Sequence, residues 1–380
     1  MAIVMAQDVS LLVAVAIFIV PWIVASMLVR RLFLRNEISL KEDLHRSLIR
    51  GLSIIPVETL RRFLKRRDPT SLLDVSRFMD GKSELCIKVS EGLCSGYWIC
   101  RGPPGQFTRP KDSDLVVLWF HGGAYCLGDP LGEAVNLLRI AEYLADHNVK
   151  ASIFSVDYTL APFAVYPHQQ EEAIAAYRYL LQKEGIEPSR ICIAGESAGG
   201  HLALSFLLAL RDANLPKPRG ALLLCPWINL MDESPSFKRN KDRDALNKNL
   251  LDRAVNLLVP RDSDGKLPVV AAVNLTRPLT GGRTWKQVLP AYSWINIGGH
   301  DILLDDATQF VHQARLDGAV VDLEVTKGKP HGWHLTANKA SETGYKNLTP
   351  NELVPEGIMP GSELIAKAFL EILEKSESRL

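Results

Sequence analysis

The sequence lacks the features of several protein classes. Its 380 residues contain only six cysteines without regular spacing, so we expect neither a disulfide framework nor a zinc or other metal site. The formal net charge of +1 gives no overall bias toward nucleic acid. Neither an internal repeat nor a low-complexity tract is found. With 47% hydrophobic residues, the chain can build one large α/β core plus an extension.

The most informative segment is Gly195–Gly200, with the sequence GESAGG. It directly follows the apolar run Ile191–Ala194 and directly precedes the helix-like run His201–Leu208. A strand, a sharp turn and a helix are therefore predicted, with Ser197 at the apex. Glycines flank the serine because the turn is too tight for side chains, and the strained turn lifts the hydroxyl to where a base can reach it. Ser197 is the candidate nucleophile, and an ordinary turn serine is the alternative.

A serine hydroxyl needs a base, an orienting acid and an oxyanion hole to react at neutral pH. The chain offers these groups in the order serine, acid, histidine that such a strand–turn–helix arrangement predicts. Asp301 comes just after the apolar run Trp294–Ile297, and His331 follows the strand-like segment Val320–Val325. Both lie where a strand ends, and active sites of open α/β sheets form at those ends.

Each partner of the serine has alternatives. Asp301 could instead cap a helix, because Asp305 and Asp306 lie close by and a helical pattern begins at Ala307. His331 has three competing histidines, and the Pro-His-Gly-Trp loop favours His331 over them: His300, His312 and His334.

The oxyanion hole has its own signature. The buried-strand run Leu115–Phe120 is followed at once by the residues HGGAY. Gly122 and Gly123 let the backbone approach an acyl group closely and aim N–H donors at it. The N–H of Ala198, at the start of a helix, is the further donor. His121 lies within this loop and is interpreted as structural.

Together these motifs resemble the hormone-sensitive-lipase-like branch of the α/β-hydrolases. The resemblance runs from about Leu115 to the C-terminal helix, with Ala124 where many members have a third glycine and Phe163 where many have glutamate. It implies an α/β-hydrolase fold with a mostly parallel central sheet, helices on both faces and a helical cap. The matching segments are 121–125, 157–162 with 166–167, 195–200, 298–301 and 331–332.

The pattern of apolar runs predicts the same architecture independently. Leu85–Val89 and Tyr97–Cys100 are expected to form an antiparallel pair. Helices such as His168–Glu184 and Ala198–Arg211 alternate with further strands, which indicates a mostly parallel sheet. The expected strands are Leu115–Phe120, Ala151–Val156, Ile191–Ala194, Ala221–Leu224, Trp294–Ile297 and Val320–Val325.

The alternation breaks between Trp227 and Leu289. Asp244–Leu258 has apolar residues at helical spacing, and this fold usually inserts a cap between nucleophile and acid, so an insertion over about 228–290 is expected. Four aromatic residues flank the motifs and could line an apolar acyl or alcohol pocket, with core packing as the alternative for each. They are Tyr125, Tyr158, Trp227 and Trp333.

The N-terminal segment carries a separate signal. Val9–Val29 has no charged side chain and is long enough to cross ~30 Å of hydrocarbon as a helix. We interpret it as a membrane anchor, with a cleaved secretory signal and a buried soluble helix as alternatives. Asp8 precedes the run, whereas four basic residues follow it, so the positive-inside rule places the catalytic domain in the cytoplasm. The four are Arg30, Arg31, Arg35 and Lys41.

The anchored chain is expected in the endoplasmic reticulum membrane as a single-pass protein. Anchored members of the resembled family can face the lumen instead, and the sequons at Asn274 and Asn347 would be usable only there. We expect an anchor over 1–35, cap or juxtamembrane helices over 36–84 and the catalytic domain over 85–380.

The segment from Leu40 to about Asp68 is helical and basic in pattern. Its basic side is either a solvated helix face or a cap helix facing anionic headgroups. The apolar stripe is Leu60, Phe63 and Leu64, and the basic residues are Arg61, Arg62, Lys65, Arg66 and Arg67.

The predicted activity is hydrolysis of a carboxylic ester through Ser197, His331 and Asp301, without a cofactor or a metal. The anchor suggests a small lipophilic ester as the binding partner, such as an acetylated sterol, a neutral lipid or an acylated natural product, and no nucleic acid. An amidase, a lactonase or a product-releasing hydrolase of a secondary-metabolite pathway is an alternative. A non-catalytic receptor on the same fold is the alternative from another class.

Overall fold

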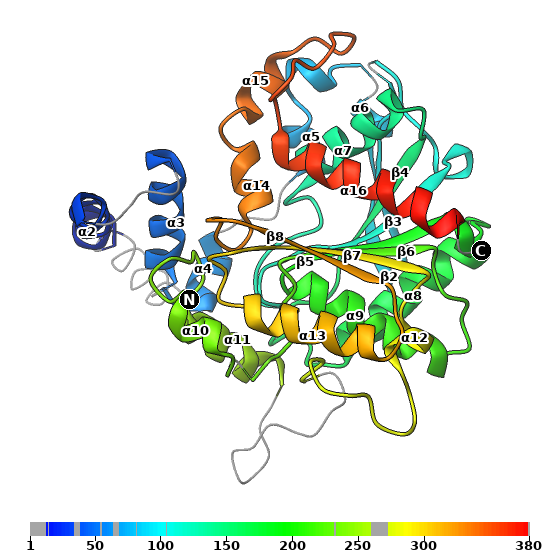
Figure 1. Cartoon of the computed structure of the whole chain (residues 1–380). Coiled ribbons are helices and arrows are strands. Elements are labelled where there is room, and N and C mark those ends of the chain that lie inside the picture. Colours follow the sequence, from blue (N-terminus) through cyan, green and yellow to red (C-terminus); the bar gives the residue numbers. More distant parts are fainter. Residues whose placement is uncertain are drawn as a thin grey trace.

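A computed structural model describes residues 13, 15–33, 39–53, 55–63, 68–80, 82–103, 105–231, 233–259 and 273–378. An eight-stranded sheet in the order β1-β2-β4-β3-β5-β6-β7-β8 runs through the middle of the molecule, with helices on both faces (Figure 1). Neighbouring strands from β4 through β8 are parallel, and β1 and β2 join antiparallel at one edge. The strands are β1 (Cys86–Glu91), β2 (Cys94–Cys100), β3 (Leu115–Phe120), β4 (Ala151–Val156), β5 (Ile191–Glu196), β6 (Gly220–Leu224), β7 (Tyr292–Gly298) and β8 (Val321–Thr326).

The predicted strands all form, and the expected mostly parallel sheet with helices on both faces is confirmed. The strand β3 shows why the apolar runs are continuous. Val116, Leu118 and Phe120 belong to one core cluster, whereas Val117 and Trp119 belong to the other. Because successive side chains of a strand point to opposite faces, a strand covered on both sides needs apolar residues at every position.

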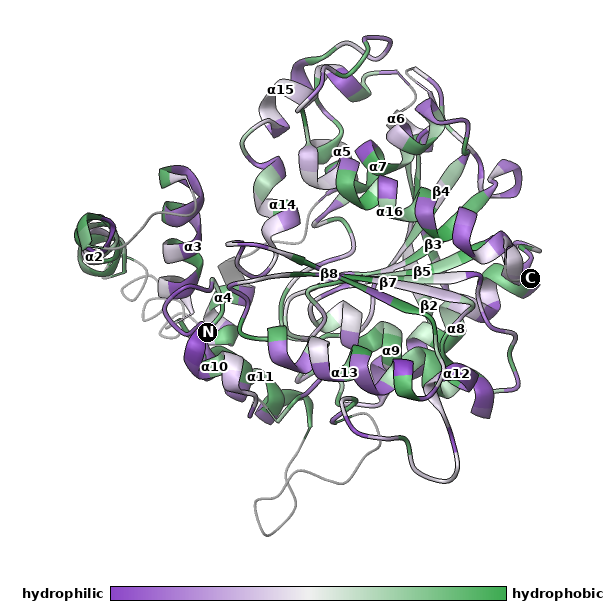
Figure 2. Cartoon of the chain, in the orientation of Figure 1, coloured by the Kyte–Doolittle hydropathy of each residue, from purple (hydrophilic) through white to green (hydrophobic). Residues whose placement is uncertain are grey.

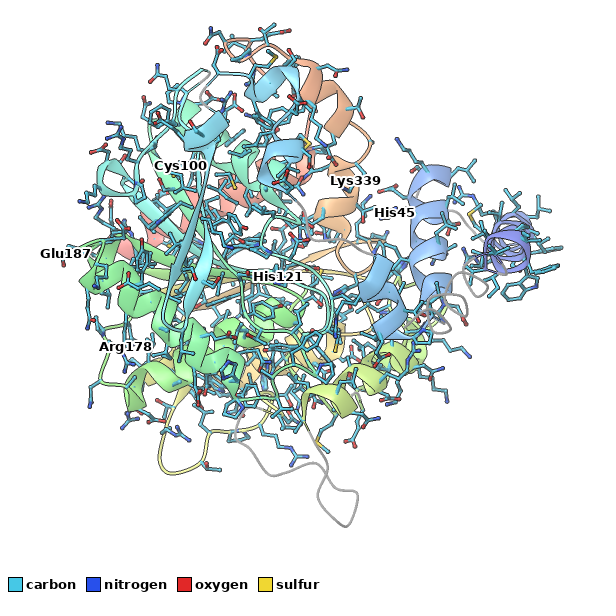
Figure 3. The ribbon with its side chains drawn as sticks, turned by 180° about the vertical axis from the view of Figure 1, so that it is seen from behind. His45, Cys100, His121, Arg178, Glu187 and Lys339 are labelled. Atoms are coloured by element: carbon cyan, nitrogen blue, oxygen red, sulfur yellow. The ribbon has the colours of Figure 1, made fainter. Side chains whose placement is uncertain are left out.

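Two layers of helices cover the sheet (Figure 1). The helices α7 (Ala134–Asp146) and α16 (Pro360–Glu377) pack on one face, and α8 (His168–Gln182), α9 (Ala198–Asp212) and α13 (Leu304–Leu316) pack on the other. Shorter helices lie at the periphery, namely α5 (Pro69–Leu72), α6 (Lys82–Leu85), α10 (Pro235–Arg239), α12 (Trp285–Val288), α14 (Trp333–Asn338) and α15 (Glu342–Asn347). Seen from behind, His121 lies near the centre, whereas Arg178 and Glu187 lie at the rim (Figure 3).

The insertion after β6 carries a helix that is shorter than predicted. The helix α11 (Lys248–Leu258) begins four residues after the expected start at Asp244. The side chain of Asn247 accepts a hydrogen bond from the N–H of Leu250 and so caps the helix. Asp244 lies outside the helix, where its carboxylate accepts hydrogen bonds from the backbone N–H groups of His331 and Ile302. Part of the predicted 228–290 cap, residues 260–272, lies outside the described residues.

The N-terminal helices stand beside the rest of the molecule (Figure 1). A π-helical turn, Val15–Ile19, runs into α2 (Val20–Phe33), which Figure 2 shows as largely hydrophobic. The following helix is α3 (Leu40–Leu52). The predicted run Val9–Val29 lies partly outside the described residues, as do Asp8 and Arg35.

The predicted helical segment after Leu40 divides into two helices. The helix α4 (Val57–Phe63) starts after Pro56, where proline ends the preceding pattern. Arg61 is not a solvated or headgroup-facing residue: its guanidinium donates to the carbonyls of Cys126 and Ala161. It therefore fastens α4 to the loops after β3 and β4. Leu64 and the three basic residues after it lie outside the described residues.

Candidate active site

Ser197 occupies the predicted apex between β5 and α9. Its φ of 54° and ψ of −115° are rare for a residue with a side chain. A Cβ at Gly195 would lie 2.3 Å from the carbonyl oxygen of Gly199, and a Cβ at Gly199 would lie 2.0 Å from that of Phe120. The backbone passes too close to itself and to β3 for side chains at these two positions. This confirms the predicted steric reason for the glycines.

Asp301 and His331 lie next to each other at the carboxyl ends of β7 and β8. The distance from His331 Nδ1 to Asp301 Oδ2 is 2.9 Å. The other oxygen of Asp301 accepts the N–H of Leu303 at 2.9 Å, so the carboxylate is held on both sides. Asp301 is fully buried and His331 is 8% exposed. This is an arrangement in which an aspartate orients an imidazole.

The alternatives for the acid occupy other sites. Asp305 forms an exposed ion pair with Arg239, and Asp306 accepts hydrogen bonds from Asn229 and Ser234. Burial raises the pKa of Asp306 to about 6.

The competing histidines also lie elsewhere or have other partners. His334 is fully buried against Asn296, with Nε2 2.8 Å from Oδ1, and burial lowers its pKa to about 3. His312 is exposed on α13. His121 stacks on Tyr158, as expected for a structural residue.

A further carboxylate faces the histidine from the position before the serine. Glu196 Oε1 lies 3.7 Å from His331 Nε2. Burial raises the pKa of Glu196 to about 7, although the neighbouring His331 opposes this shift. Burial alone would lower the pKa of His331, but Asp301, Glu196 and Asp244 outweigh it and raise the value to about 9. The imidazolium is therefore stabilised by its surroundings.

The glycine loop after β3 lies against this group. A Cβ at Gly122 would lie 1.8 Å from Glu196 Oε2, and a Cβ at Gly123 would lie 2.2 Å from the carbonyl of Leu127. Gly123 also has a φ of +114°. Ala198 begins α9, so its N–H is one of the unpaired donors at that helix start. The predicted oxyanion residues thus lie around Ser197.

A cavity of about 140 Å³ brings these groups together. Ser197, His331, Glu196 and Gly123 contribute to its wall, and apolar side chains from α4, the loop after β3 and the insertion form the rest. The apolar lining residues are Val57, Ala124, Cys126, Leu127, Leu246, Leu250, Leu251 and Ala254.

The four aromatic residues predicted for the pocket do not line this cavity. Tyr125, Tyr158 and Trp227 are fully buried in the core, where Tyr125 contacts His201 and Tyr158 donates to the carbonyl of His121. Trp333 donates to Asn296 and lines a neighbouring hollow beneath α3. Aliphatic side chains surround the cavity instead, because the insertion folds over it.

Two carboxylates of the site were missed by the sequence argument. Glu196 lies inside the serine motif, and its side chain could have been expected near the apex. Asp244 lies in the insertion, far from every motif along the chain. Its oxygens accept the backbone N–H groups of His331 and Ile302, both at 2.7 Å. No local pattern predicts that contact.

One set of metal-ligand atoms adjoins the site. The ligand atoms of Cys225, Asp301 and His331 lie within 4.8 Å of one another. A thiol binds a metal as the thiolate, and burial raises the pKa of the Cys225 thiol well above its ordinary value. This environment disfavours the ligating form of the sulfur, and the three residues fit a metal poorly.

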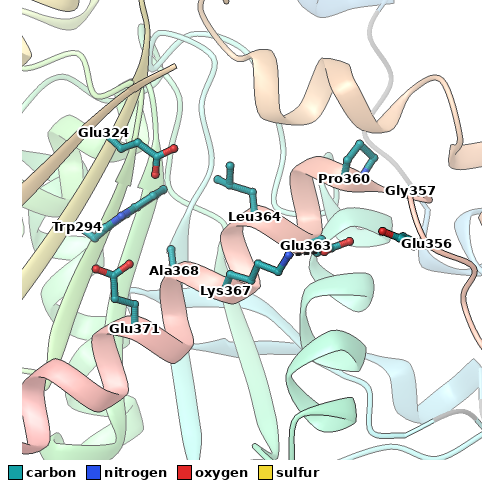
Figure 4. A pocket seen from close by; sticks show the side chains of 10 residues that line it. All are labelled: Trp294, Glu324, Glu356, Gly357, Pro360, Glu363, Leu364, Lys367, Ala368 and Glu371. Atoms are coloured by element: carbon teal, nitrogen blue, oxygen red, sulfur yellow. Dashed lines mark hydrogen bonds and ion pairs between the residues drawn. The ribbon is translucent and has the colours of Figure 1, made fainter. Parts of the chain in front are cut away.

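Two larger hollows lie away from the serine. One of about 460 Å³ runs between α3 and α14, where Figure 3 labels His45 and Lys339. The other, of about 450 Å³, follows α16 and is lined by Trp294, Lys367 and four glutamates (Figure 4). Neither contains Ser197 in its wall.

Comparison with known proteins points to one family. A family model described as alpha/beta hydrolase fold matches residues 117–335. An acetyl-hydrolase of Streptomyces hygroscopicus is 32% identical over 248 residues, which are 65% of this chain and 74% of that protein. The carboxylesterase NlhH of Mycobacterium tuberculosis is 28% identical over 292 residues, covering 73% of this chain and 82% of that protein.

Solved structures agree with these sequence matches. An esterase from the bacterial hormone-sensitive lipase family superposes with a TM-score of 0.58 at 26% identity, covering 95% of this chain and 97% of that one. An esterase/lipase from an uncultured bacterium has a TM-score of 0.65 at 23% identity, covering 89% and 100%.

Proposed function

The chain belongs to the α/β-hydrolase family that its residues 117–335 match, and we propose that it is a serine carboxylic-ester hydrolase with Ser197, His331 and Asp301 as its triad. The observation that carries the proposal is the cavity in which Ser197 and His331 share a wall while Asp301 holds the far nitrogen of the imidazole. Relatives named as an acetyl-hydrolase and as carboxylesterases support the same reaction.

The proposed reaction proceeds through an acyl-enzyme. His331 takes the proton of the Ser197 hydroxyl as the oxygen attacks the ester carbonyl. The N–H groups of Gly122, Gly123 and Ala198 bind the oxyanion. His331 passes its proton to the departing alcohol. A water molecule, deprotonated by His331, then attacks the acyl group. The bond from the acyl carbon to the Ser197 oxygen breaks, and His331 returns the proton to that oxygen as the acid leaves. The raised pKa of His331, about 9, stabilises the imidazolium that forms at each addition step, and the neutral imidazole that starts each step predominates only above that pH.

The cavity supports a short acyl group. Its volume of about 140 Å³ is close to the ~150 Å³ of an engineered apolar cavity that holds benzene. Leucines of the insertion make its wall apolar. We therefore propose the acetyl ester of a lipophilic alcohol as the substrate class, with an acetylated sterol, or an acylated natural product whose acyl group is acetyl, as examples.

A substrate panel tests this function. The full-length protein in detergent is assayed with p-nitrophenyl esters from acetyl to dodecanoyl, with the matching anilides and with a lactone. We expect hydrolysis of the esters, fastest for acyl chains of two to four carbons, because longer chains exceed the cavity. Faster cleavage of the anilide or lactone would support the amidase or lactonase alternative. No turnover and no labelling by a fluorophosphonate would support a receptor.

We further propose that α2 anchors the protein in a membrane and that residues 36–84 connect this anchor to the catalytic domain over 85–380. Val15–Phe33 forms 19 helical residues with a mean hydropathy of 1.9, and 17% of its most apolar window is buried. Ile17, Phe18 and Trp22 are each more than half exposed. Exposed apolar side chains on such a helix are suited to lipid. The basic residues after it favour a cytoplasmic catalytic domain.

We expect the full-length protein to resist carbonate extraction. Deletion of Met1–Val29 should release a soluble enzyme that still hydrolyses small esters, because Arg30 and Arg31 remain to bind Asp43 of α3. Extraction and activity assays on the two forms check this. In sealed microsomes the catalytic domain should be accessible to protease. Protection with glycosylation at Asn274 or Asn347 would reverse the orientation, and release of the intact chain by carbonate would refute the anchor.

A further inference from the structure

Asp244 is a buried carboxylate with an unusual set of partners. Its side chain is 0% exposed and lies in the turn between α10 and α11. Oδ1 accepts the backbone N–H of His331 at 2.7 Å and that of Ala245 at 2.6 Å, and Oδ2 accepts that of Ile302 at 2.7 Å. In all three hydrogen bonds the donor is a backbone N–H group. Taking a charged group out of water is costly, so its retention here calls for a role.

The two long-range bonds join the two loops that carry the base and the acid. His331 is itself the base of the proposed triad, and Ile302 directly follows Asp301. The same segment holds the acid loop at two more points, since Asn240 Nδ2 donates to the carbonyl of Asp301 at 2.8 Å and Ser236 Oγ donates to that of Ile302 at 2.6 Å. The segment 236–244 of the insertion therefore holds both loops in place, and we call this segment the brace.

The brace is supported on its outer side by the N-terminal helices. Arg46 donates to the carbonyl of Asp242 at 3.1 Å, and Arg50 donates to that of Leu246 at 2.9 Å. Asp43 of α3 fixes Arg46 through an ion pair of 2.5 Å. The position of Asp244 is thus determined from both sides.

We infer that Asp244 is a positioning residue of the triad, one that holds the backbone of His331 and Ile302 so that His331 Nδ1 stays within 2.9 Å of Asp301 Oδ2. The inference rests on the proposed function. A carboxylate suits this task because both of its oxygens accept and neither carries a hydrogen toward the N–H donors. Burial raises the pKa of Asp244 to about 7, so above that pH the carboxylate also adds a negative charge beside the imidazole, where positive charge forms during the reaction.

Asp244→Asn replaces one accepting oxygen with an NH₂ group, which must face an N–H donor. We expect kcat to fall about 10- to 100-fold, the range that a displacement of a catalytic group by about 1 Å can produce. KM for p-nitrophenyl acetate should change less than about twofold, because Asp244 does not line the cavity. The full-length protein in detergent is used, and rates are taken per folded enzyme, counted by circular dichroism.

The pH profile separates positioning from a general loss of packing. Glu196 and Asp301 face His331 from the ends of β5 and β7, and Asp244 faces it from the insertion. Glu42, His45 and Arg46 of α3 border the hollow next to it. Loss of the Asp244 charge should lower the pKa of His331 and move the acidic limb of kcat/KM to lower pH by about one unit.

Asp242→Asn is the matched control. Its carboxylate lies in the same turn, is 69% exposed and pairs with Arg50 at a distance of 3.8 Å, and the substitution keeps the backbone carbonyl that binds Arg46. It should leave kcat, KM and the pH limb unchanged. If Asp244→Asn does not fold, Asp244→Ser is measured in its place. The inference would be overturned if the Asp244 variant had the wild-type kcat per folded enzyme and an unchanged acidic limb of kcat/KM. Failure of the proposed function looks different, since the wild-type protein would then show no ester turnover, or Ser197→Ala would keep the turnover of the wild type.

Discussion

Ser197→Ala is expected to lower kcat for ester hydrolysis on the order of 10³-fold or more, as for a member of a catalytic triad. The alanine has no oxygen to attack the carbonyl or to accept the acyl group. Folding should be retained, because Ala and Ser meet the same backbone strain at a φ of 54°. Hydrolysis of p-nitrophenyl acetate, fluorophosphonate labelling and thermal unfolding measure the three expectations.

Ser205→Ala provides the comparison for this substitution. Ser205 is also buried and lies on α9, the helix that follows Ser197, but its hydroxyl donates to the carbonyl of Leu202 and does not line the cavity. The variant should keep full hydrolysis and labelling. Labelling that persists in Ser197→Ala at another serine would show that the nucleophile is assigned wrongly.

We expect Asp301→Asn to lower kcat by about 10⁴-fold, the effect of presenting the wrong histidine tautomer to the serine. The asparagine can keep its oxygen on the N–H of Leu303 and then turns its NH₂ group toward His331 Nδ1. The histidine must accept at Nδ1, so Nε2 carries the proton and cannot act as the base. Loss of the Asp301 carboxylate should also lower the pKa of His331, which moves the residual activity to lower pH.

Asp305→Asn and Asp306→Asn separate this effect from a general loss of negative charge. Asp305 pairs with Arg239 at the surface, so its change should be nearly neutral. Asp306 is buried against Asn229 and Ser234, so Asp306→Asn should lower the unfolding temperature. Its effect on kcat should be small. A larger loss of kcat in either variant than in Asp301→Asn would mean that the acid lies elsewhere.

The sheet was predictable because its signals are local. Continuous apolar runs such as β3 and β4 have the predicted bounds, since a strand buried on both faces has few alternatives. The strained apex at Ser197 was predictable for a similar reason. Glycines are required there because the backbone of a short segment leaves no space for a Cβ. The predicted start of α11 was wrong by four residues, because Asp244 accepts a hydrogen bond from the distant His331 and lies outside the helix.

The pocket wall depended on contacts that no local pattern contains. Tyr125, Tyr158 and Trp227 flank the motifs in sequence, yet the core holds all three away from the cavity. Arg61 has the spacing of a solvated face, but the approach of α4 to the loops after β3 and β4 gives it one carbonyl partner from each loop.

Local sequence patterns were enough to predict the order of strands and helices along the chain, the strained turn at Ser197 and the order of the candidate triad. Each of these follows from apolar periodicity or from the steric needs of neighbouring residues. Tertiary structure decided that Asp244 meets His331 and that Glu196 lies 3.7 Å from the same imidazole. Burial then shifts the pKa of each group. Such contacts join segments far apart in the chain, and their distances exist only once the sheet and the insertion have packed together.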